Sequence, residues 1–67
     1  MKTFQQRLKE VREQKKISQI DLANKIGVDR TTISGYETKG REPNIQTLIM
    51  LADVLQVSID YLVGRED

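Results

Sequence analysis

At 67 residues the chain has room for one small core, and a domain of this size buries only roughly 60% of the surface that its unfolded chain exposes. Its 37% hydrophobic and 31% charged residues fit a compact globular domain rather than a disordered segment. The chain has no Cys and no His, which excludes disulfides, thiolate metal sites and the commonest general base of enzymes.

Other classes of protein are also disfavoured by what the chain lacks. It has no glycine loop that would cradle a phosphate and no plausible nucleophile–base pair, so we expect no enzyme, no cofactor, no metal and no small-molecule ligand. No apolar run approaches the ~20 residues of a membrane span, and no signal peptide is visible at the start. We therefore expect a cytoplasmic protein without a membrane contact.

The net charge of +1 hides an uneven distribution along the chain. Residues 1–41 carry ten Lys and Arg against five Asp and Glu, whereas residues 42–67 carry one Arg against five Asp and Glu. A basic front half and an acidic back half favour a polyanionic partner on one side of the molecule. An ordinary solvated surface accounts for the same asymmetry, so the charge by itself does not decide.

The first two predicted helices both begin at a hydroxyl residue. The stretch "TFQQ" at Thr3 has the form of a capping box and begins a helix over about 3–15. Its core-facing stripe is Phe4, Leu8 and Val11. Ser18 begins a second helix over 18–26, which ends at Gly27, where a left-handed residue is wanted. The buried positions of that helix are Leu22, Ala23 and Ile26.

Three more helices follow the same logic. Asp29 and Asn44 are good N-caps for helices over about 29–37 and 44–55, and Ser58 begins a short last turn over 58–64. The core faces of the last two helices hold Leu48, Leu51, Ala52, Leu55, Ile59 and Leu62. Because the connections are short, we expect an all-α fold, a compact bundle of five short helices that forms a single domain over 1–67.

Only Gly27, Val28 and Asp29 join the second predicted helix to the third. A three-residue turn that contains glycine makes two short helices cross steeply, as in the helix-turn-helix. Ala23 lets the two helices approach, and Val28 is expected to pack into the angle between them. Such a corner also occurs in many proteins that never touch DNA. The turn alone therefore does not distinguish a DNA-binding motif from a purely structural corner.

The predicted third helix separates two kinds of side chain. On a helical wheel its inward side holds Ile33, Tyr36 and Glu37. Its outer side presents Arg30, Thr31, Ser34 and Gly35. A recognition helix needs this arrangement, because its first turn enters the major groove and offers hydrogen-bonding side chains to base edges. Gly35 either allows a close approach to the groove or is a tolerated glycine, and the sequence favours neither.

The stretch "SQIDLANKIGVDRTTISGYETKGREPNIQTLIMLADVLQVSIDYLVG" resembles the helix-turn-helix domain of the phage repressor and Cro family, including its xenobiotic-response-element-type bacterial regulators. The matching positions are Ser18-Gln19, Leu22-Ala23, Gly27-Val28, Thr32-Ile33-Ser34, Tyr36-Glu37, Pro43, Leu48, Leu51-Ala52, Leu55, Val57-Ser58 and Leu62. The resemblance implies a lambda-repressor-like domain of five helices. It also implies a transcriptional regulator, repressor-like, that binds a palindromic double-stranded DNA operator.

The resemblance also implies roles for individual residues. The base-reading set is Gln19, Arg30, Thr31, Ser34 and Gly35, with Ser34 turned toward the DNA backbone. The phosphate-binding set is Ser18, Thr32, Thr38, Lys39, Gly40, Arg41 and Asn44. Arg12 and Glu37 are implied to form an ion pair between the first helix and the recognition helix. The chain departs from the family at Gly35, where a longer polar residue is common.

Pairing of two copies is expected, because one recognition helix spans only a few base pairs. The candidates for the interface of a weak or DNA-assisted homodimer are Tyr61, Val63 and part of the fourth helix. That helix has more apolar residues than one core stripe requires, namely Ile45, Ile49, Met50 and Val54. For Ile45 and Ile49 we expect closure of the core instead.

A second function class remains compatible with the sequence, namely a helical protein-interaction module of the same fold that binds a protein. The two differ in salt dependence, since phosphate-mediated binding weakens steeply as salt rises.

Overall fold

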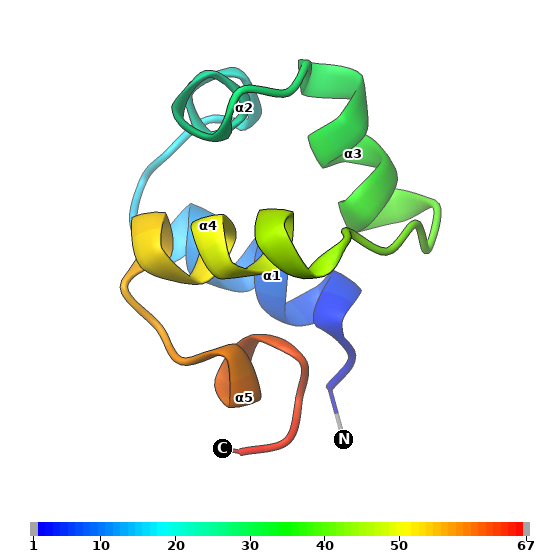
Figure 1. The fold of residues 1–67 in the computed structure, drawn as a ribbon, viewed down its shortest axis with the longest axis vertical. Coiled ribbons are helices and arrows are strands. Elements are labelled where there is room, and N and C mark those ends of the chain that lie inside the picture. Colours follow the sequence, from blue (N-terminus) through cyan, green and yellow to red (C-terminus); the bar gives the residue numbers. More distant parts are fainter. Residues whose placement is uncertain (1, 67) are drawn as a thin grey trace.

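The computed structural model describes residues 2–66, in which five α-helices and no strand are present. The helices are α1 (Phe4–Gln14), α2 (Gln19–Ile26), α3 (Arg30–Thr38), α4 (Ile45–Leu55) and α5 (Ile59–Leu62). In Figure 1, α2 and α3 lie at one end of the molecule, α4 crosses in front of α1, and α5 lies at the other end beside both chain ends. The all-helical fold expected from the sequence is therefore confirmed.

Each of the five helices begins directly after the residue that the sequence indicated as its N-cap. The capping side chains each accept one backbone N–H three residues ahead, and they belong to Thr3, Ser18, Asp29, Asn44 and Ser58. At Thr3 the reciprocal bond from its own backbone to the Gln6 side chain completes a capping box. Such a cap contributes about 1 kcal/mol to helix stability, so these starts are locally determined.

Every helix contributes to one core. Its completely buried leucines and isoleucine are Leu8, Leu22, Ile33, Leu51, Leu55 and Leu62. Phe4 of α1 packs edge-to-face on Tyr36 of α3, with ring centroids 6.2 Å apart. These contacts fix α3 against α1 through the inward side of α3.

The turn between α2 and α3 has the geometry that its glycine suggested. Gly27 lies in the left-handed region at φ 76°, and the Val28 N–H donates to the Ala23 carbonyl. Ala23 is only 1% exposed, which leaves no space for a longer side chain between the helices. In Figure 1, α2 is seen nearly end-on while α3 runs across the view, so the two helices cross steeply.

Two expectations for α4 were wrong. Ile45 and Ile49, which we expected to close the core, are 74% and 42% exposed. Leu51, Ala52 and Leu55 occupy the core side of α4, and Ile45 is the first residue of the helix. An apolar strip that also includes Met50 is therefore left on the surface.

The orientation of α5 also differs from the expectation. Ile59, expected to be buried, is 38% exposed, whereas Tyr61, a candidate for the dimer interface, is half-buried. The guanidinium carbon of Arg7 lies 4.1 Å from the centre of the Tyr61 ring. This cation–π contact from α1 turns Tyr61 inward. The helix is also shorter than the expected range 58–64, because Val63 is its C-cap.

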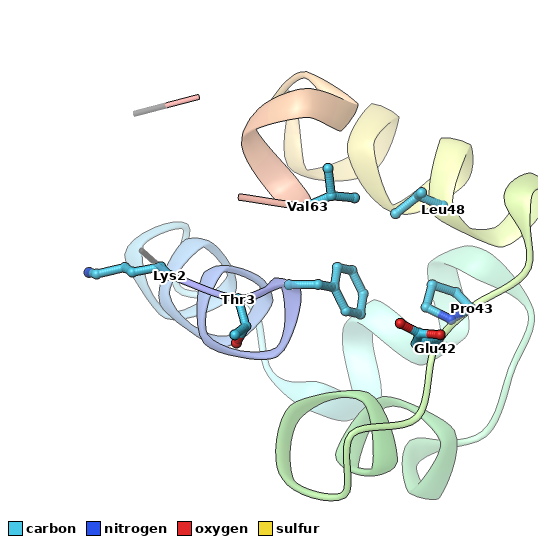
Figure 2. A pocket seen from close by; sticks show the side chains of 7 residues that line it. Lys2, Thr3, Glu42, Pro43, Leu48 and Val63 are labelled. Carbon is cyan, nitrogen blue, oxygen red and sulfur yellow. The ribbon is translucent and has the colours of Figure 1, made fainter. Parts of the chain in front are cut away.

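Val63 lines an apolar hollow of about 430 Å³ on the side of the molecule away from the start of α3. Figure 2 shows Val63 and Leu48 on one side of the hollow, with the N-terminal turn of α1 and Pro43 on the other. No helix within residues 2–66 is long and apolar enough to cross a membrane.

Gly64 is expected to tolerate alanine less well than Gly27. Both have positive φ, but a Cβ at Gly64 would lie 2.2 Å from the Lys2 carbonyl oxygen, whereas a Cβ at Gly27 would meet nothing within 4 Å. Gly27→Ala should cost about 1–2 kcal/mol of unfolding free energy, the cost of a left-handed alanine. Gly64→Ala should cost clearly more, because the backbone of Lys2 must also move. Urea unfolding of the two variants measures the difference. Equal losses of unfolding free energy would contradict the packing of the Lys2 backbone on Gly64.

Candidate nucleic-acid interface

The first turn of α3 is organised around the Asp29 carboxylate. Its Oδ1 accepts the Thr32 backbone N–H at 2.9 Å, the Thr32 hydroxyl at 2.7 Å and the Thr31 hydroxyl at 2.9 Å. These hydrogen bonds, first those from the Thr32 and Thr31 hydroxyls, lower the pKa of the Asp29 carboxyl. Because the Thr31 hydroxyl proton is engaged with Asp29, the hydroxyl of this exposed residue can act toward a partner only as an acceptor.

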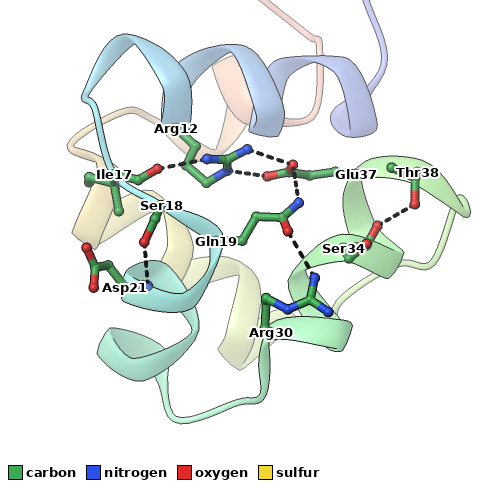
Figure 3. A network of polar contacts seen from close by, with 9 residues as sticks. All are labelled: Arg12, Ile17, Ser18, Gln19, Asp21, Arg30, Ser34, Glu37 and Thr38. Atoms are coloured by element: carbon green, nitrogen blue, oxygen red, sulfur yellow. Dashed lines mark hydrogen bonds and ion pairs between the residues drawn. The ribbon is translucent and has the colours of Figure 1, made fainter.

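A chain of polar side chains connects α1 to the first residue of α3 (Figure 3). Arg12 donates from Nε to Glu37 Oε2 at 2.6 Å and from Nη2 to Glu37 Oε1 at 3.1 Å. Gln19 donates from Nε2 to Glu37 Oε1 at 3.0 Å, and its Oε1 accepts from Arg30 Nη1 at 3.4 Å. The chain therefore passes from a buried ion pair to an exposed arginine.

The ion pair that the resemblance implied is present and buried. The side chains of Arg12 and Glu37 are 10% and 1% exposed, and Arg12 also donates to the Ile17 carbonyl at 2.8 Å. The hydrogen bond to Glu37 raises the pKa of the Arg12 guanidinium, although burial opposes this. Four segments meet at this pair: α1, the connection to α2, the first residue of α2, and the inward side of α3.

Several residues of the expected phosphate set already use their polar side-chain atoms in hydrogen bonds to other groups of the protein. The Thr32 hydroxyl donates to Asp29, and the Thr38 hydroxyl donates to the Ser34 carbonyl at 2.7 Å. The caps are placed differently: Ser18 Oγ and Asn44 Oδ1 accept backbone N–H groups of their own helices. Their remaining donors, a hydroxyl and an amide nitrogen, stay at exposed residues.

The loop after α3 turns back onto the outer face of the helix. Gly40 has φ 69°, and the Lys39 and Arg41 N–H groups both donate to the Gly35 carbonyl, at 3.0 and 3.2 Å. Lys39 and Arg41 thereby join Thr31 and Ser34 around a polar hollow of about 200 Å³. Gly35 also lines it, so two residues of the expected phosphate set and three of the expected base-reading set share this hollow.

Gly35 is not open to solvent as its position on the helical wheel suggested. It is buried, and a Cβ built on it would lie 2.9 Å from Arg41 Cδ. The Arg41 side chain covers the glycine from outside. Helical periodicity does not reveal this contact, because Arg41 belongs to the following loop, and only Gly40 in the sequence hints at a reversal of the chain.

Loss of Glu37 is expected to be severe. In Glu37→Ala the Arg12 guanidinium stays buried without its carboxylate, which should cost about 3–5 kcal/mol of unfolding free energy. Asp53→Ala removes an exposed acidic residue of α4, far from the ion pair in sequence, and should cost less than about 0.5 kcal/mol. Urea unfolding compares the two variants, and similar losses would show that the ion pair does not hold α3 in place.

Comparison with known proteins agrees with this geometry. A family model described as helix-turn-helix matches residues 8–62. An uncharacterised HTH-type transcriptional regulator of Bacillus subtilis, YqaE, is 43% identical over 63 residues, which are 94% of this chain and 54% of the relative. The chain thus spans about half the length of this curated relative.

Two similar proteins of known structure are complexes with DNA. The P22 c2 repressor in complex with a synthetic operator superposes with a TM-score of 0.91 at 33% identity, covering 98% of this chain and 100% of that one. The regulator of biofilm formation SinR, in complex with DNA, superposes with a TM-score of 0.81 at 36% identity, covering 90% of this chain and 97% of that one. This chain belongs to the helix-turn-helix family of phage-repressor-like transcriptional regulators.

Proposed function

We propose that this chain is the sequence-specific DNA-binding domain of a transcriptional regulator of repressor type, acting in the cytoplasm and not as an enzyme. The observation that carries the proposal is the exposed first turn of α3, which presents Arg30 and Thr31. Arg30 also donates to Gln19 at the start of α2. The fit to the P22 c2 repressor on its operator supports it. The chain inserts this turn into the major groove of double-stranded DNA.

Base reading is assigned chiefly to Arg30 and Thr31. The fork of Arg30 matches guanine O6 and N7, and Thr31 offers its methyl group to a thymine methyl. Gln19 holds Arg30 from the side while its own amide is held by Glu37. The buried ion pair of Arg12 thus orients Arg30 through Glu37 and Gln19.

Positioning on the phosphates is assigned to residues at the two ends of the α3 face. Ser18 and Asn44 lie at the starts of α2 and α4, where backbone N–H groups favour an anion. Lys39 and the Gly40 backbone lie in the exposed loop between α3 and α4. Thr32 and Thr38 bind phosphate only by releasing internal bonds, which makes them weaker members of the set.

A homodimer on a palindromic operator completes the proposal. One small domain makes few base contacts, and two-fold pairing doubles them. The pairing surface must leave α3 free, which favours the α4–α5 side, where Ile49, Met50 and Ile59 are exposed. Tyr61 and Val63 are half-buried there, so they contribute their edges rather than whole side chains.

Arg30→Ala is expected to reduce discrimination between DNA sequences. Loss of a guanine fork should cost about 1–3 kcal/mol on the preferred site and flatten the preference at one or two base pairs. Selection of bound fragments from a random DNA pool, followed by titration of the preferred and scrambled sites, measures both effects. Retained selectivity with lower affinity for all sequences would make Arg30 a phosphate contact.

Lys39→Ala tests the phosphate contacts, in contrast to the base contact that Arg30→Ala removes. It should weaken binding to all sequences about equally and reduce the slope of log affinity against log salt by about one unit. Lys25→Ala removes an exposed lysine of α2 as the control and should leave the slope unchanged. A Lys39→Ala slope equal to that of Lys25→Ala would remove Lys39 from the phosphate set.

Two protomers are expected on a full palindrome with half-site centres about 34 Å apart. Sedimentation of the protein at saturating concentration, with the palindrome and with a single half-site, counts the bound copies. The palindrome should carry two copies and the half-site one. A single copy on the full palindrome would refute the pairing.

A further inference from the structure

The side chain of Arg41, from the loop after α3, lies against Gly35 of that helix. A Cβ on Gly35 would lie 2.9 Å from Arg41 Cδ, 3.4 Å from its Nε and 3.6 Å from its Cγ. The first distance is shorter than a carbon–carbon contact allows. The Arg41 side chain therefore runs through the space that a side chain at position 35 would occupy.

Two backbone features hold Arg41 at this place. Gly40 adopts φ 69°, which reverses the chain after α3, and the Arg41 N–H donates to the Gly35 carbonyl at 3.2 Å. The side chain of Arg41 then lines the same hollow as Thr31 and Ser34. The loop thus places the Arg41 guanidinium on the outer face of α3.

We propose that Arg41 is a base-reading residue, positioned by the missing side chain of Gly35, rather than a phosphate contact of the loop. This inference rests on the DNA-binding function proposed above. The absence of a side chain at Gly35 leaves the space in which the Arg41 side chain lies. The Arg41 guanidinium then makes a bidentate contact with a guanine edge in the major groove, at the base pair next to the one that Thr31 contacts.

The cost of a glycine within a helix agrees with this role. Gly35 lowers the stability of α3 relative to alanine, and nothing in the inward packing of the helix requires it, since the nearest atoms to its Cβ position all belong to Arg41. The atom that a methyl group would strike lies far along a flexible side chain. Gly35→Ala should therefore displace Arg41 without unfolding the protein.

Four variants test the proposal: Arg41→Ala, Arg41→Lys, Gly35→Ala and the double variant Gly35→Ala/Arg41→Ala. Selection from a random DNA pool first gives the preferred site of the unsubstituted protein. Arg41→Ala should then relax the preference at one base pair and weaken binding to the preferred site roughly tenfold. Arg41→Lys keeps the charge but loses the fork, so it should relax the same base pair.

Gly35→Ala is the sharper variant. It should raise or maintain the melting temperature and relax the same base pair as Arg41→Ala. The double variant should match Arg41→Ala in its selected sequences, because Gly35 acts only through Arg41. The inference is overturned if Gly35→Ala selects the same sequences as the unsubstituted protein. It is also overturned if its methyl group changes selection in the Arg41→Ala background.

The phosphate alternative has a distinct outcome. If Arg41→Ala weakens binding to all sequences equally and Arg41→Lys restores it, Arg41 is a phosphate contact and the inference is wrong. If the unsubstituted protein selects no site at all, the proposed function itself fails. The two failures are distinguished by the first selection, before any variant is compared.

Discussion

The buried ion pair between Arg12 and Glu37 is the interaction on which the arrangement of α3 depends. Two hydrogen bonds join the side chains, at 2.6 and 3.1 Å, in a place where Glu37 is almost inaccessible to water. Burying these charges costs free energy that only a close, doubly bonded geometry offsets. The pair therefore tolerates few positions of α3 relative to α1, and it specifies an orientation that apolar packing alone would leave looser.

That orientation explains how a short helix with a polar outer face is stable. The inward side of α3 contributes Ile33 and Tyr36 to the core and Glu37 to the ion pair, while Asp29 satisfies the N–H group of Thr32 and both threonine hydroxyls. Stability is thus supplied from the inward side and from the cap. The outer face is left to carry Arg30, Thr31 and Ser34 for another purpose, and Gln19 transmits the position of Glu37 to Arg30.

The local features of this fold were predictable because they arise from short-range chemistry. Each N-cap involves a residue and a backbone N–H three positions ahead, and Gly27 has a backbone conformation that few other residues adopt. The errors fell where side chains from distant segments compete for space. Ile45 remained on the surface because Leu51 and Leu55 already filled the core. The contact of Arg7 of α1 with the Tyr61 ring also joins distant segments, and no local pattern indicated it.

The sequence by itself determined the five helices, their starts, the helix-turn-helix and the polar outer side of the third helix. Helical periodicity and N-capping depend only on residues a few positions apart. Only the tertiary structure decided that Arg41 lies across Gly35, that Gln19 bridges Glu37 and Arg30, and which apolar residues of α4 and α5 stay exposed. Gln19 and Glu37 are 18 positions apart and lie on different helices, and Arg41 reaches Gly35 from the following loop. Their geometry follows from how the helices dock, and local sequence patterns do not encode it.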